Sequence, residues 1–144
     1  MICARAELAA LLMKAARGAG LPLALAEDLY QMADFVTAED VSRLTDEIEA
    51  GGASLIALTH DLDAVACGVA MASNDPLAPA LAAAQGWVLA DGRKADGLPN
   101  KRAGALDIPD DVLHRLNALA ARTYVPETAA SRARGAGAGA IDND

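Results

Sequence analysis

The chain has 144 residues and a formal charge of −8 at pH 7, and 53% of its residues are hydrophobic although only 3% are aromatic. A chain of this length is expected to form one domain and to bury enough surface to fold without a disulfide or a structural metal. Because nucleic acids and anionic membrane surfaces require a basic stripe that this sequence does not have, we expect neither as a partner.

The first predicted helix covers residues 4–17. Leu8, Leu11 and Leu12 follow helical spacing in this segment, and Gly18 is suited to the end of the helix. The leucine stripe faces the core or forms a self-complementary surface. We expect the second arrangement to support a homodimer, the commonest oligomer of globular proteins.

Two further amphipathic helices follow in the most acidic part of the chain. Pro22 suits the first turn of the second helix, where its missing N–H costs nothing. Thr37 and Asp40 have the spacing of a capping box, which predicts a third helix over residues 38–50. Ten acids and a single base, Arg43, fall within residues 21–63.

The middle of the chain is its most apolar part. We predict a short strand over residues 54–58, and we expect Asp61 to cap a helix over residues 61–73. This helix has almost no polar face, so we expect it to be the most buried element, with Val69 inside it. Cys67 lies in the same run and is interpreted as a core residue rather than a nucleophile.

The remaining elements are shorter. The sequence pattern predicts a helix over residues 75–85 and a strand over residues 87–90. It predicts a loop over residues 91–104 and another strand over residues 105–108. Pro109 begins the last helix, with acidic residues in its first turn.

The fold class is therefore predicted to be mostly α. We expect a single α-rich domain of five or six helices over residues 1–130, with a minor β element of two or three short strands. An α+β fold with a larger sheet is the alternative. Residues 131–144 form a separate Gly- and Ala-rich C-terminal tail.

Both ends of the chain carry distinctive strings. One is Lys14-Ala-Ala-Arg-Gly-Ala-Gly-Leu-Pro22; the other begins with Leu119-Ala-Ala-Arg-Thr-Tyr-Val-Pro126 and continues into Ser-Arg, Gly-Ala-Gly-Ala-Gly and Asp-Asn-Asp in the tail. These strings resemble an uncharacterised bacterial family, domain of unknown function 3726. The resemblance does not extend to the middle of the chain, and it implies no activity, cofactor or catalytic residue.

The tail is the candidate ligand site. Successive glycine N–H groups can form an anion-binding nest, arginines can bind a carboxylate or phosphate, and aspartates can supply oxygen ligands to a cation. The residues concerned are Arg132, Arg134, Gly135, Gly137, Gly139, Asp142 and Asp144. A frayed C-terminus is the alternative interpretation.

Other combinations of reactive residues are less specific. A metal site is one interpretation of His60, Asp61 and Asp63 together with the distant His114, but helix capping by Asp61 explains the pattern more simply. We therefore expect no metal and no cofactor.

Two functional hypotheses follow. The first is a non-enzymatic interaction or accessory protein of the bacterial cytoplasm that self-associates. The second is a protein or enzyme that binds a small anionic metabolite through its tail.

Overall fold

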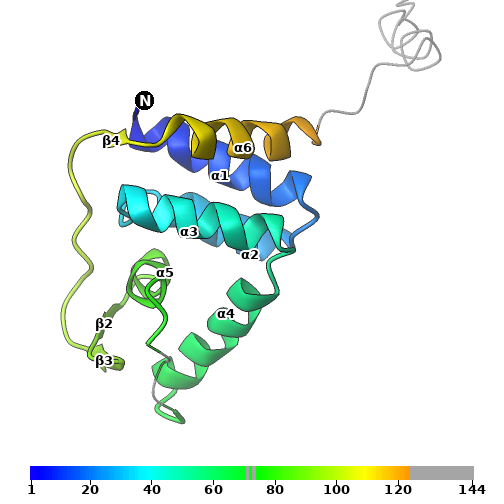
Figure 1. Cartoon of the computed structure of the whole chain (residues 1–144). Helices are drawn as coiled ribbons and strands as arrows, with labels where there is room; N and C mark the ends of the chain where they lie inside the picture. The colour runs from blue at the N-terminus through cyan, green and yellow to red at the C-terminus, as the bar shows by residue number, and fades with distance from the viewer. Residues whose placement is uncertain (71, 73, 124–144) are drawn as a thin grey trace, which may run out of the picture.

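The computed structural model describes residues 1–70, 72 and 74–123 (Figure 1). Within these residues the chain forms six helices and two short two-stranded ladders, which confirms the prediction of a mostly α fold with a minor β element. The helices are α1 (Arg5–Gly18), α2 (Leu23–Met32), α3 (Ala38–Glu49), α4 (Ala53–Ala66), α5 (Ala78–Ala84) and α6 (Asp110–Ala121). The strands are β1 (Ile2–Cys3), β2 (Val88–Ala90), β3 (Arg93–Ala95) and β4 (Leu106–Asp107).

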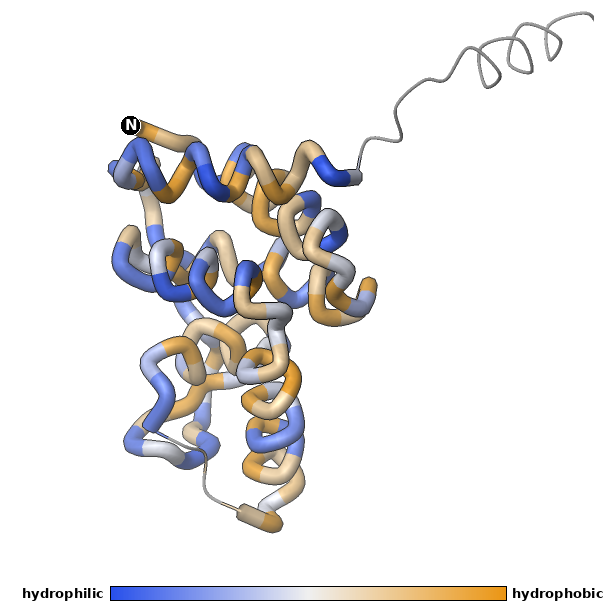
Figure 2. Tube along the Cα trace, turned by 45° about the vertical axis from the view of Figure 1, so that its right-hand side comes forward, coloured by the Kyte–Doolittle hydropathy of each residue, from blue (hydrophilic) through white to orange (hydrophobic). Residues whose placement is uncertain are grey.

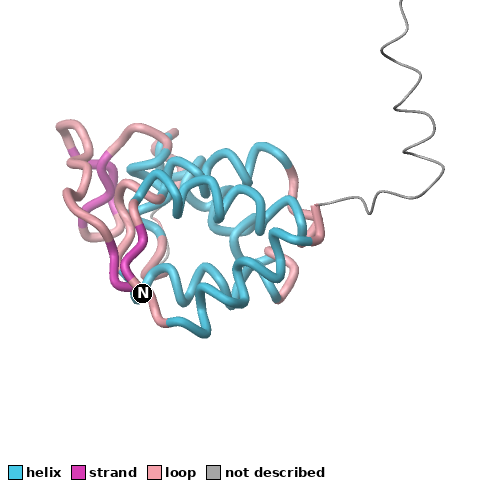
Figure 3. Tube along the Cα trace, turned by 90° about the horizontal axis from the view of Figure 1, so that it is seen from above, coloured by secondary structure: helices cyan, strands magenta, loops and turns pink. Residues whose placement is uncertain are grey.

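The helices are arranged in layers (Figure 1). Helices α1 and α6 lie side by side, α2 and α3 lie beneath them, and α4, α5 and the β2–β3 hairpin occupy the opposite end of the molecule. Seen from above, the strands gather at one side of the helices (Figure 3). The large buried side chains form one connected core, which includes Leu8, Leu12, Leu29, Leu44 and Leu116.

The two ladders differ in how well they were predicted. Strand β2 agrees with the predicted strand, but β3 lies in a segment predicted to be a loop. Asp91 and Gly92 between them both have positive φ, as the tight turn of a two-residue hairpin requires. Strand β4 was predicted, whereas β1, with which it pairs antiparallel, was not.

Three basic residues hold the turn between α2 and α3. Arg5 Nη1 donates hydrogen bonds to the carbonyl oxygens of Ala33 and Val36, at 2.6 and 3.2 Å. Arg102 donates through Nε to the Phe35 carbonyl at 2.8 Å, and Lys101 pairs with the side chain of the adjacent Asp34 at 2.7 Å. Cations stabilise the carbonyl end of a helix. The contacts of Lys101 and Arg102 anchor the long segment between β3 and β4 to the helical layers.

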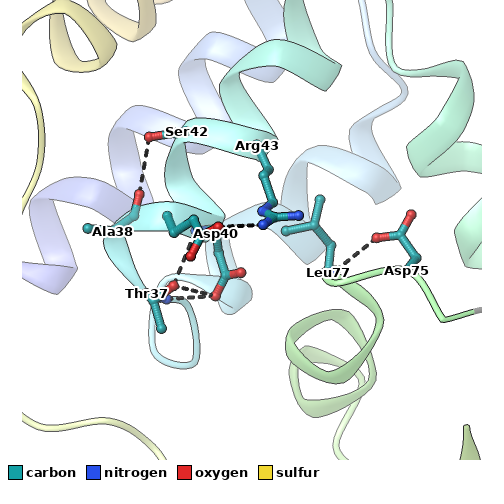
Figure 4. A network of polar contacts seen from close by, with 8 residues as sticks. Thr37, Ala38, Asp40, Ser42, Arg43, Asp75 and Leu77 are labelled. Atoms are coloured by element: carbon teal, nitrogen blue, oxygen red, sulfur yellow. Dashed lines mark hydrogen bonds and ion pairs between the residues drawn. The ribbon is translucent and has the colours of Figure 1, made fainter.

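The predicted capping box of α3 is confirmed (Figure 4). The Thr37 backbone N–H donates to the Asp40 carboxylate at 2.8 Å, and the Asp40 N–H donates to the Thr37 hydroxyl oxygen at 3.2 Å. One turn further on, Arg43 pairs with Glu39 and lies toward the turn that contains Asp75. The charges at the start of α3 are therefore satisfied locally.

Gly18 of α1 lies against the backbone of α6. A Cβ at this position would lie 1.9 Å from the Leu119 carbonyl oxygen and 3.4 Å from the Cβ of Arg122. The two strings that carry the family resemblance thus meet where these helices touch. Their contact gives a packing reason for glycine at position 18.

The prediction for the middle of the chain was wrong. Residues 54–58 are helical rather than a strand, and Asp61 lies inside α4 rather than at its cap. Gly52, with φ of 75°, precedes the helix, and Gly68 has the same φ just beyond its end. The buried residues of α4 follow one helical stripe that starts earlier than predicted: Leu55, Leu58, Leu62 and Val65.

Burial in this region also differs from the prediction. Val65 is 5% exposed, but Val69 lies beyond the helix and is 80% exposed. Cys67 is exposed as well, so it is not a core residue. Helix α4 lies at the edge of the molecule (Figure 1), where few neighbours cover it, and an apolar sequence alone does not ensure burial.

Candidate interaction surface on helices α2 and α4

The residues proposed from the sequence as a ligand site all lie in the tail, outside the described residues, so that site stays a prediction. The proposed dimer stripe does not form an exposed surface. Leu8 and Leu12 have no exposed area and belong to the core, and Leu11 is only half-buried. Any self-association must therefore use another surface.

The structure also does not bring together the residues that the sequence offered as a metal site. His60, Asp61 and Asp63 lie on α4, whereas His114 lies on α6. Across residues 1–70, 72 and 74–123, no three His, Cys, Asp or Glu side chains are placed to hold a metal ion.

A different surface is formed where α2, the turn before it and α4 adjoin; we call it the α2–α4 face. Its residues are those that line the two hollows described below, together with Leu23 and Asp63. It includes three large, exposed apolar or aromatic residues, Leu23 (49% exposed), Tyr30 (42%) and Ile56 (37%). The exposed residues in the first half of α4 include Ala53, Ile56 and Ala57, whereas its second half carries His60, Asp61 and Asp63. Figure 2 shows α4 as mostly hydrophobic along its length, with hydrophilic residues in its second half.

Two hollows open on this face. The larger, of about 430 Å³, is lined by Met13, Glu27, Asp28, Tyr30 and Gln31. The smaller, of about 160 Å³, lies between α2 and α4 and is almost entirely apolar, with Pro22, Leu25 and Ile56 in its walls. Asp28 lines both hollows, and its side chain is half-buried.

The acids of this face have no partners among the residues that the structure describes. Glu27, Asp28 and Asp63 make no ion pair or hydrogen bond through their carboxylates with any described residue, and α2 and α4 contain no Lys or Arg.

The acids of α3 provide a contrast. Glu39 pairs with Arg43, and Asp46 and Glu49 both pair with Arg115 of α6.

The pKa shifts follow the same division. Burial raises the pKa of Asp28 above its ordinary value, and the nearby charges of Asp63 and Glu27 raise it further. On α3, the hydrogen bonds from Arg115 lower the pKa of Glu49. The negative charge on the α2–α4 face is therefore crowded and has no paired cation among the described residues, whereas three of the five acids of α3 pair with an arginine.

A third hollow, of about 420 Å³, lies between α5, the β2–β3 hairpin and the segment that follows it. Phe35, Trp87 and the exposed Leu98 line it together with Asp96 and Arg102. Arg102 is already bonded to the α2–α3 turn, which gives it a structural role. The α2–α4 face, whose charges have no such role, is the stronger candidate.

Comparisons with protein-family models, curated proteins and solved structures gave no match. None of the helices in the described ranges is long and apolar enough to cross a membrane. The functional argument therefore depends on the geometry and charge of the α2–α4 face.

Proposed function

We propose that this chain is an interaction protein that binds a protein partner across the α2–α4 face. One observation carries the proposal: exposed apolar side chains share this face with three carboxylates, Glu27, Asp28 and Asp63, that have no partner in the described structure. Single exposed apolar residues are common on proteins and need no explanation. Here Tyr30 and Ile56 each line a hollow that Asp28 also lines, a combination that a complementary partner would cover.

A second copy of the chain fits this face poorly. A two-fold interface places the same patch on both sides, so carboxylates without partners would face carboxylates. A different protein is the better partner. The bacterial cytoplasmic location, membership of the resembled family and the alternative of anionic-metabolite binding by the tail remain proposals, supported by the sequence patterns described above. Self-association is also a proposal, but it would use a surface other than the leucine stripe of α1, because Leu8 and Leu12 are buried.

The proposal can be tested with a phage-displayed library of random 12-residue peptides selected on the immobilised full chain. We expect enriched peptides to shift the backbone amide resonances of α2 and α4. The double variant Leu23→Ser/Ile56→Ser should lower their affinity about tenfold or more, because truncating central apolar anchors commonly costs this much.

A matched control removes apolar surface elsewhere. Val69→Ser/Leu98→Ser changes two side chains that are more exposed than Leu23 and Ile56 but lie outside the α2–α4 face. This control should leave peptide affinity unchanged. The proposal is wrong if no peptide is enriched, if the shifted resonances lie elsewhere, or if both double variants have the same effect.

A further inference from the structure

The position of Asp28 between the two hollows indicates what kind of partner the face accepts. We propose that the bound segment carries a Lys or Arg between two apolar side chains, with the cation paired to Asp28 and one apolar side chain in the hollow on each side. This inference rests on the proposed function and adds to it the chemistry of the partner.

The apolar part of the inference follows from the walls of the hollows. Pro22, Leu25 and Ile56 give the smaller hollow an apolar lining, and Met13 and the ring of Tyr30 contribute to the larger one. An apolar side chain entering either hollow removes hydrocarbon from water on both partners, which is favourable in proportion to the area covered.

The cationic part follows from what a partner would do to Asp28. The carboxylate is half-buried already, and it has no hydrogen-bond or ion-pair partner in the described part of the chain. A purely apolar segment would bury an unpaired charge, which is strongly unfavourable. An acidic segment would add to the repulsion from Glu27 and Asp63. A Lys or Arg removes both penalties.

A helix can present the three groups on one side. Residues at positions i, i+3 and i+7 share a face, as in the amphipathic helices that bind apolar grooves. The probe is therefore a 15-residue peptide of Ala and Gln that contains Leu-x-x-Lys-x-x-x-Leu. A second peptide has norleucine in place of Lys, which keeps most of the aliphatic stem and removes the charge.

The experiment measures the affinity of both peptides for the full chain and for two variants. Asp28→Asn removes the charge between the hollows, whereas Asp61→Asn removes an equal charge from an exposed position on α4 that lines neither hollow. We expect Asp28→Asn to weaken binding of the Lys peptide about tenfold or more and not to weaken binding of the norleucine peptide. Asp61→Asn should change either affinity less than about twofold. Far-UV circular dichroism checks that both variants are folded.

The outcomes separate this inference from the proposed function. Equal weakening by Asp28→Asn and Asp61→Asn would show attraction to the overall negative charge and would overturn the inference. Failure of the Lys peptide to bind would also overturn the inference. Library peptides that bind the face equally well without the Asp28 charge would overturn the inference too, but the proposed function would then stand. If the library yields no peptide that binds this face, both fail.

Discussion

Replacing Gly18 with alanine tests the packing of α1 against α6. The new methyl group would lie 1.9 Å from the Leu119 carbonyl oxygen, about 1.4 Å closer than the ~3.3 Å at which carbon and oxygen meet in proteins. Helix propensity alone favours the substitution by up to ~1 kcal/mol. Forcing extra volume into a packed interface costs ~1–3 kcal/mol, and partial exposure of the buried Leu119 would add ~1–2 kcal/mol.

The net expectation is a loss of about 2–4 kcal/mol of unfolding free energy. Urea denaturation followed by far-UV circular dichroism should show it as a fall of about 1 M or more in the midpoint. Gly20→Ala is the control, because Gly20 has φ of 83° but no atom near its would-be Cβ, so only a backbone cost of ~1 kcal/mol applies. A Gly18→Ala variant as stable as the wild type would refute the proposed contact.

Three further predictions concern α3, α4 and the α2–α4 face. Val65→Asp should prevent folding, whereas Val69→Asp should leave the melting temperature nearly unchanged, because only Val65 is buried. If the two variants had the same melting temperature, the described end of α4 would be contradicted. Thr37→Ala should lower stability by ~1 kcal/mol in urea titration through loss of the helix cap, and an unchanged midpoint would count against the capping box. The raised pKa of Asp28 means that the folded chain binds this proton more tightly than the unfolded chain, so ionisation destabilises the fold as pH rises. Asp28→Asn should therefore raise the melting temperature at pH 7, and this gain should vanish below the ordinary carboxyl pKa of 3.8; a lower melting temperature at pH 7 would disprove it.

Local signals in the sequence predicted local structure well. The Thr37–Asp40 spacing predicted the start of α3, because a capping box depends on residues within one turn of each other. The hairpin had a comparable signal in Asp91-Gly92, which favours a two-residue turn, but this signal was interpreted as part of a loop. The stripe from Leu55 to Val65 likewise contained the helical spacing that the strand prediction missed.

Exposure could not be predicted in the same way, because it depends on which neighbours cover each element. Leu8 and Leu12 of α1 are buried, with α2 and α6 packed against their helix, although the stripe alone also suited a dimer surface. Ile56 is part of an equally apolar helix, but α4 lies at the edge of the fold and leaves it exposed. The α2–α4 face arises from two helices that adjoin only after folding, and neither has a motif that identifies the face.

The pairing of α1 with α6 has a consequence for synthesis of the chain on the ribosome. Leu12 emerges near the start of translation, yet α6, which covers part of its helix, begins only at Asp110. At typical elongation rates of about 5–20 residues per second, this interval of about 100 residues takes roughly 5–20 s. Throughout this interval the nascent chain exposes part of the α1 stripe, so α1 is the segment where a chaperone or an early aggregation contact has the longest time to act.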